Sequence, residues 1–140
     1  MLQKMHVLLL VCITAVLAAC GGGGDSSADA TPNFAGKYIE TLTLTNNTCN
    51  LAMSATITAS DTVTQSGAAV SINSDGIILN GSVDTDNGGF TVSGIPVISG
   101  VAVPSSIKYR TITSGSKYAM TFNLSVNSCV VTYTGTATKI

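Results

Sequence analysis

The sequence is poor in charged and aromatic residues. Only 9% of its 140 residues are charged, and the six Lys and Arg and seven Asp and Glu form no run of either sign. A nucleic-acid surface needs a basic patch, so we expect no nucleic-acid partner. Tryptophan is absent and aromatic residues make up 5% of the chain, which leaves few of the side chains that usually anchor protein interfaces.

Histidine occurs once, as His6, in the N-terminal head of the chain. The rest of the sequence therefore cannot form a Ser-His-Asp triad, a Cys-His pair or a histidine metal site. It also contains neither a Gly-x-Ser-x-Gly motif nor a phosphate-binding glycine-rich loop. We therefore expect no enzymatic activity, no cofactor and no metal site.

The N-terminus has the three-part layout of a secretory signal. Lys4 lies in a short head, residues 7–19 are apolar apart from Thr14, and small residues precede Cys20. The apolar run is too short to span a bilayer as a helix, which needs about 20 apolar residues. Leu17-Ala18-Ala19-Cys20 resembles the lipobox of bacterial lipoproteins, in which the cysteine is acylated and the chain is cut just before it.

The lipobox resemblance implies that residues 1–19 are a signal peptide and that Cys20 carries fatty acyl chains such as palmitate. Two or more such chains anchor a protein stably, so the membrane is an expected partner. Gly21, rather than Asp, follows the cysteine, which resembles the outer-membrane signal of Gram-negative lipoproteins. We expect a lipid-anchored protein of the cell envelope, at the outer membrane, on its periplasmic face or at the cell surface. The alternatives are an ordinary secretory signal with a chance cysteine and an uncleaved membrane helix.

Residues 20–33 are rich in Gly, Ser, Ala and Asp and show no apolar periodicity. Such a segment is typical of a flexible tether, here with an r.m.s. reach of about 20 Å. It precedes a β domain that we place at residues 34–140. Cys12 lies in the signal peptide and Cys20 in the lipobox, which leaves Cys49 and Cys129 as partners for a disulfide in an exported compartment.

From Phe34 onward, apolar residues alternate with Thr and Ser, which is the period-two pattern of β-strands. Turn signals such as Ser60-Asp61 separate the strands. Gly67 marks a bulge or break inside the third strand, and residues 94–105 form a long, partly extended connection. The predicted strands are residues 36–45, 49–59, 62–73, 76–84, 89–94, 105–113, 116–126 and 129–138.

Eight short antiparallel strands in a meander can close into an up-and-down barrel or fold as a two-sheet β-sandwich. We expect an all-β domain built as the barrel, with the sandwich as the alternative. The outer face of Thr and Ser suits water, which argues against a barrel embedded in a membrane. The opening Phe34-Ala35-Gly36-Lys37-Tyr38 resembles the Gly-x-Trp opening of lipocalins, with Tyr38 at the position of the family's Trp.

Strand parity predicts a disulfide between Cys49 and Cys129. In a meander, the turn between the first two strands and the turn between the last two lie at the same end of the sheet. Each cysteine follows one of these turns. The first and last strands are neighbours in a closed barrel, so the two Cα atoms should lie about 5–6 Å apart.

The segment Asp84-Thr85-Asp86-Asn87-Gly88-Gly89 is similar to the start of a calcium loop. That motif needs oxygen ligands at its fifth and twelfth positions, which are Gly88 and Ile95 here. Asp and Asn followed by Gly are also typical of a polar hairpin turn, which is the preferred interpretation.

Two other groups could carry chemistry. Glu40 with some Asp could form a glycosidase pair, although carboxylates this sparse are more often solvated edge charges. Lys108, Tyr109 and Arg110 could clamp a ligand, although Lys on an exposed strand more often prevents edge pairing.

The expected function is that of a non-enzymatic binding domain for a small apolar ligand. An eight-stranded barrel is just wide enough to be filled by side chains or to hold one small ligand. The alternative is an envelope structural or protein-interaction domain with a filled core. An apolar cavity of about 300 Å3 or more would distinguish the two. The sequence identifies no ligand-binding residue.

Overall fold

The computed structural model of the protein describes residues 30–113 and 115–140. The predicted signal peptide, the lipidated Cys20 and the tether as far as residue 29 lie outside the described residues. The expected β domain falls within one compact unit, Thr31–Ile140. The described part of the chain contains no helix that is long and apolar enough to cross a membrane.

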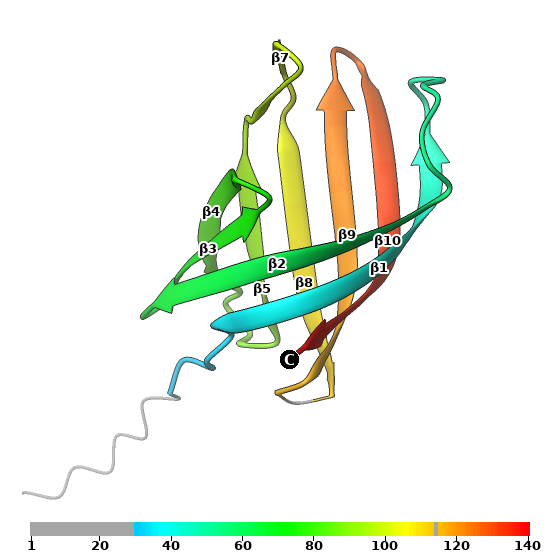
Figure 1. Ribbon diagram of the computed structural model, residues 1–140. Helices are drawn as coiled ribbons and strands as arrows, with labels where there is room; N and C mark the ends of the chain where they lie inside the picture. Colours follow the sequence, from blue (N-terminus) through cyan, green and yellow to red (C-terminus); the bar gives the residue numbers. More distant parts are fainter. Residues whose placement is uncertain (1–29, 114) are drawn as a thin grey trace, which may run out of the picture. The chain divides into compact units, whose positions relative to one another are not determined.

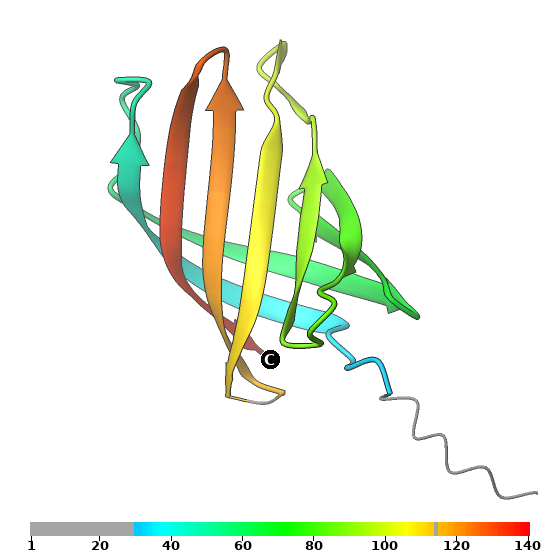
Figure 2. The same cartoon turned by 180° about the vertical axis from the view of Figure 1, so that it is seen from behind.

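Eight strands of the described residues close into an antiparallel up-and-down barrel (Figures 1 and 2). Consecutive barrel strands pair with each other, and β1 also pairs with β10, so Leu42 of β1 lies between Ile57 of β2 and Gly135 of β10. The expected barrel is confirmed, and the two-sheet sandwich is wrong. The barrel strands are β1 (Gly36–Asn47), β2 (Thr56–Ser66), β3 (Ala69–Ser74), β4 (Ile77–Val83), β5 (Gly89–Gly94), β8 (Ser105–Thr113), β9 (Lys117–Val126) and β10 (Cys129–Lys139).

The second strand differs from the prediction. β2 runs through Ser60 and Asp61, which we expected to form a turn, and it ends just before Gly67. Asp61 has the same parity as the inward-facing Val63, and both side chains are buried, so Asp61 belongs to the inner face of the strand. Gly67, expected as a bulge inside a strand, has φ of +58° and provides the left-handed conformation of the actual turn.

Residues 48–55 form a loop, although we expected a strand to begin at residue 49. The Asn47 side chain donates a hydrogen bond from Nδ2 to the Leu51 carbonyl oxygen at 2.8 Å, and Asn50 has φ of +53°. These local interactions turn the chain out of the sheet. Cys49 therefore lies in a loop and does not open a strand.

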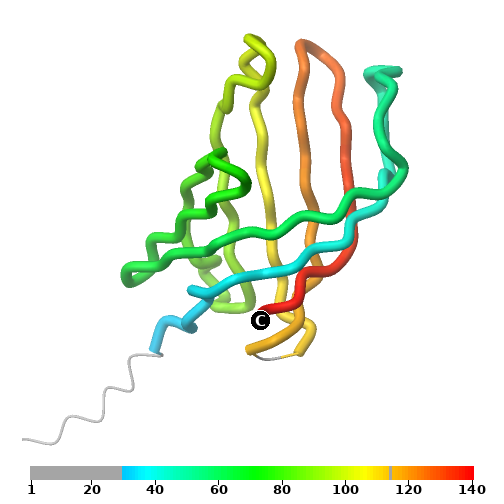
Figure 3. The backbone as a smooth tube through the Cα atoms, in the orientation of Figure 1, coloured from blue at the N-terminus to red at the C-terminus, as the bar shows by residue number. Residues whose placement is uncertain are grey.

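The connection from β5 to β8 is long and partly extended, as predicted. It also contains a short hairpin of β6 (Val97–Ile98) and β7 (Val101–Ala102), which turns at Ser99-Gly100. Figures 1 and 3 place this hairpin at the upper end of the barrel, together with the 48–55 loop and the β9–β10 turn, whereas the β3–β4 turn ends lower. We call this end the open end and the opposite end, where the chain enters at Thr31–Phe34, the closed end.

Aromatic rings fill the closed end. Five of them are at most 3% exposed, and the centroids of contacting rings lie 4.5–6.5 Å apart, in the range of favourable tilted and stacked pairs. The Phe34 backbone N–H donates to Gln65 Oε1 at 2.7 Å, and the Tyr38 hydroxyl donates to the Phe34 carbonyl oxygen at 2.6 Å. The segment before β1 is thereby fixed as a plug. The five rings belong to Phe34, Tyr38, Phe90, Tyr109 and Tyr118.

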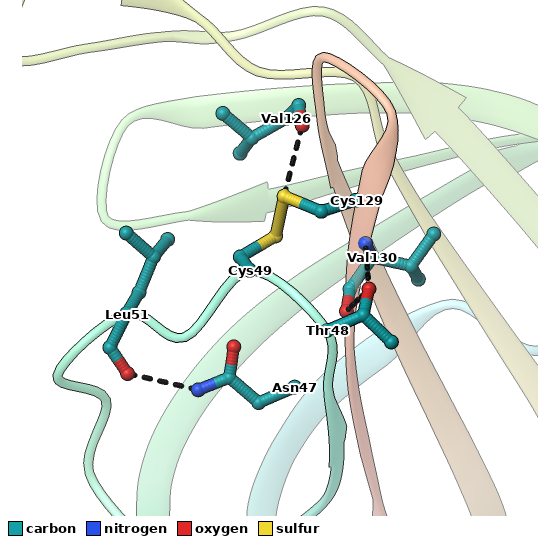
Figure 4. Close-up of a disulfide and its surroundings, with 7 residues drawn as sticks. All are labelled: Asn47, Thr48, Cys49, Leu51, Val126, Cys129 and Val130. Atoms are coloured by element: carbon teal, nitrogen blue, oxygen red, sulfur yellow. Dashed lines mark hydrogen bonds between the residues drawn. A yellow bond between two sulfur atoms is a disulfide. The ribbon is translucent and has the colours of Figure 1, made fainter.

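A disulfide at the open end joins Cys49 to Cys129, with Cα atoms 5.0 Å apart (Figure 4). The prediction is confirmed, because it depended on the position of the two turns and not on a strand at Cys49. Beside the disulfide, the Thr48 N–H donates to Val130 O at 3.0 Å and the Val130 N–H donates to Thr48 Oγ1 at 2.8 Å. Cys129 Sγ lies 3.0 Å from Val126 O, which is a contact and not a hydrogen bond because a disulfide sulfur carries no hydrogen.

Candidate ligand-binding site

A cavity of about 240 Å3 lies inside the barrel toward the open end. Its walls are mainly aliphatic, and their largest aliphatic side chains include Leu42 on β1, Ile57 on β2, Leu79 on β4, Ile107 on β8 and Met120 on β9. Its surface therefore favours contact with an apolar molecule over contact with water.

The cavity reaches the surface beside the β6–β7 hairpin. Pro96 and Ile98 line it, and Ile98 is 41% exposed. On the same connection, Ile95, Val97 and Val101 are all more than half exposed. The opening of the cavity beside this hairpin, which we call the mouth, therefore has an apolar rim.

Small side chains explain why this half of the barrel is not filled. Ala59, Ser74 and Ser105 line the cavity, whereas the inward positions at the closed end hold Phe and Tyr. An eight-stranded barrel has room either for large inward side chains or for one small ligand. The sequence thus fills one end and leaves space at the other.

Two carboxyl groups line the inner end of the cavity, and a phenol lies against them. Glu40 on β1 and Asp61 on β2 line it and are only 2% and 1% exposed. The Tyr109 hydroxyl is hydrogen-bonded to Glu40 Oε1 and lies 3.2 Å from Asp61 Oδ2. The Tyr109 ring stacks on Phe90, which fixes the position of its hydroxyl. We call Glu40, Asp61 and Tyr109 the acidic floor.

Strand register brings the two acids together. Glu40 pairs with Ala59, and Asp61 pairs with Tyr38, so the two carboxyl groups are diagonal neighbours on the inner face of the β1–β2 pair. Asp61 Oδ2 faces Tyr109, while Asp61 Oδ1 is buried and has no hydrogen-bond partner in the described structure. Buried polar atoms without partners are uncommon in native proteins, so this oxygen requires an explanation.

Glu40 holds a proton at neutral pH. The pKa of its carboxyl is raised from 4.5 to about 8, mainly because burial disfavours the charged form and further because Asp61 is close, whereas the hydrogen bond with Tyr109 opposes the rise. Burial and the two acids also raise the pKa of Tyr109 above its ordinary value, so the phenol stays protonated. One phenolic hydrogen serves only one of the two acids at a time.

The interpretation of Glu40 as a solvated edge charge is wrong. Glu40 has the same parity as the buried Tyr38 and Leu42, and Asp61 has the same parity as Val63. That parity was the signal that could have placed both acids inside the barrel. It was missed for Asp61 because Ser60-Asp61 looks like a turn.

Residues 84–88 form the β4–β5 turn at the closed end, and Gly89 begins β5, so the turn interpretation is confirmed. Arg110 Nη1 lies 3.2 Å from Asp84 Oδ2, and Arg110 Nη2 lies 2.7 Å from Asp86 Oδ2. Lys108 Nζ lies 3.9 Å from Asp84 Oδ2. The two basic residues thus hold this turn and lie away from the cavity, and Tyr109 between them points inward. Lys108 does not protect an edge, because β8 lies between β5 and β9.

Comparison of the chain with protein-family models, with curated proteins and with solved structures found no match. In residues 30–113 and 115–140, no cluster of three or more His, Cys, Asp or Glu side chains could hold a metal ion.

Proposed function

We propose that the protein is a lipid-anchored binding protein of the cell envelope whose barrel takes up a small apolar ligand without catalysing a reaction on it. The observation that carries the binding proposal is the aliphatic cavity with its apolar mouth. The lipobox at Leu17–Cys20 supports the anchor and the location at the outer membrane.

The volume of the cavity limits the ligand. Drug-sized ligands usually occupy sites of about 300–1,000 Å3, and this cavity has about 240 Å3. At roughly 30 Å3 for each water-sized group, it accommodates about eight non-hydrogen atoms. A ligand of six to eight carbon atoms therefore fits, whereas a complete acyl chain of a membrane lipid does not.

The walls also argue against a glycosidase. A sugar ring presents hydroxyl groups on all sides, and each one that is buried needs a hydrogen-bond partner. The described lining offers polar side chains only at Ser74, at Ser105 and in the acidic floor. The cavity is smaller than the volume of about 300 Å3 that would distinguish a binding domain from the other alternative, an envelope protein with a filled core. Its aliphatic lining and apolar mouth, and not its volume, support the binding proposal.

Filling the cavity tests the proposal. Ala59→Phe places a ring in the cavity, and Thr58→Phe places the same ring on the outer face of the same strand, because Thr58 is exposed. In the full chain, 1-hexanol should shift the methyl NMR signals of Ile57 and Leu79 saturably. The shifts should persist in Thr58→Phe and disappear in Ala59→Phe. Absence of saturable shifts in the unsubstituted chain, or their persistence in Ala59→Phe, would overturn the proposal.

A further inference from the structure

The acidic floor is an unusual feature at the inner end of an apolar cavity. A pocket for a purely apolar molecule gains nothing from two buried acids, because burying a carboxyl group is costly unless it is paired. Asp61 is 1% exposed, lines the cavity, and leaves Oδ1 without a partner in the described structure. The cavity therefore has a hydrogen-bond acceptor at its inner end and aliphatic walls around it.

The described residues provide no cation for these acids. Lys108 and Arg110 pair with the β4–β5 turn, and Lys37, Lys117 and Lys139 lie at strand ends that belong to the closed end. These five are all the Lys and Arg residues in the described part of the chain. Glu40 and Asp61 are thus left without a positive partner from the protein.

The two ends of the barrel differ in charge. The described cations lie toward the closed end or on the middle of β8, whereas the exposed Asp75 lies in the β3–β4 turn at the open end. The mouth therefore has no described basic residue to attract an anion. Charge of one sign at an opening favours the approach of the opposite charge.

We infer that the ligand is a short alkylamine, whose ammonium group binds Asp61 and Glu40 while its hydrocarbon chain fills the cavity toward the mouth. This inference rests on the proposed function. An ammonium group has three donors and no acceptor, so it satisfies Asp61 Oδ1 and the Glu40 carboxyl together. An alcohol brings one donor, and a carboxylate brings a negative charge beside Asp61. The order of affinity expected at equal chain length is amine, then alcohol, then carboxylate.

Three six-carbon probes test this order. Calorimetric titration at pH 6.5 compares hexylammonium, 1-hexanol and hexanoate on the full chain, with Cys20→Ser in every protein to keep it free of acyl chains. We expect hexylammonium to bind at least tenfold more tightly than 1-hexanol, and hexanoate at least tenfold more weakly. Asp61→Asn should lower the affinity for hexylammonium at least tenfold and the affinity for 1-hexanol much less, because the amide keeps an acceptor oxygen for the alcohol but no charge for the ammonium group.

Asp75→Asn is the matched control, because it removes an exposed carboxylate at the same end of the barrel. Asp75 does not line the cavity, so this change removes only a distant attraction and should alter the affinity for hexylammonium less than twofold. Equal affinity for hexylammonium and 1-hexanol, or tightest binding of hexanoate, would overturn the amine inference and leave the proposed apolar site standing. Binding of none of the three probes would overturn both. If Asp61→Asn does not fold, the comparison of the three probes on the protein with an intact acidic floor still tests the amine inference.

Discussion

Replacing Glu40 by Gln should remove most of the pH dependence of stability between pH 5 and 8. Gln has nearly the same shape as a protonated Glu, and its amide oxygen can accept the Tyr109 hydrogen bond. It never ionises, so the cost of placing a charge in the acidic floor disappears. Asp61 and Tyr109 face position 40 in both proteins, and their contributions therefore largely cancel in the comparison.

The magnitude follows from the raised pKa of Glu40. Between pH 4.5 and about 8, the folded protein holds a proton that the unfolded chain has released. The free energy of unfolding therefore falls as pH rises, by at most about 1.4 kcal/mol for each pH unit, and by as much as about 5 kcal/mol over the whole range. The stabilisation is fully present below pH 4.5 and is lost as pH rises through about 8.

Urea denaturation followed by far-ultraviolet circular dichroism at several values between pH 4.5 and 8.5 measures this effect. Glu40→Gln should match the unsubstituted protein within about 1 kcal/mol at pH 4.5, as expected for a near-isosteric change. It should be more stable by several kcal/mol at pH 8.5. Asp75→Asn, at an exposed turn, should follow the unsubstituted protein throughout. The same dependence of the free energy of unfolding on pH in the unsubstituted protein and in Glu40→Gln would refute the reasoning.

Other substitutions test the disulfide, the anchor and the absence of catalysis. Under non-reducing conditions, the free energy of unfolding should be about 4 kcal/mol lower in each of Cys49→Ala, Cys129→Ala and the double variant, because the disulfide closes a loop of 80 residues. A loss in the double variant equal to the sum of the two single losses would contradict this. Intact-mass measurement should find acyl chains on the exported protein and none after Cys20→Ser; an unacylated mass for the unsubstituted protein would refute the anchor. The full chain should not turn over generic ester, peptide or glycoside substrates, and turnover that Glu40→Gln abolishes would identify the acidic floor as catalytic.

The barrel could be predicted from sequence because alternation and turn signals are local properties. The disulfide could be predicted because strand parity fixes which turns share an end, even though Cys49 lies in a loop. The order of strands and the closure by β1 and β10 then follow from a meander of eight strands.

The cavity and its acidic floor depend on which inward side chains meet in space, and that depends on register. The turn was predicted at Ser60-Asp61 but lies at Gly67. Asp61 is therefore not in a connection but on the inner face of β2, beside Glu40. No local pattern shows that Ala59 has a small neighbour across the barrel or that Tyr109 reaches both acids. Parity was the usable signal: Glu40 falls between two apolar residues of the same parity, and Asp61 shares the parity of Val63, although the apparent turn at Ser60-Asp61 concealed it.

The plug at Phe34 has a consequence for orientation. The polypeptide joins the barrel at Thr31–Phe34, on the opposite side of the molecule from the mouth. A protein attached to a bilayer through Cys20 would therefore be connected to it through the closed end of the barrel. Its opening would then be free to face the surrounding water, and nothing in this attachment would press the opening against lipid. Under the proposed function, such a protein would capture solutes that diffuse past it and would not extract them from the bilayer. Freely dissolved, short-chain compounds are the cargo that this geometry suits.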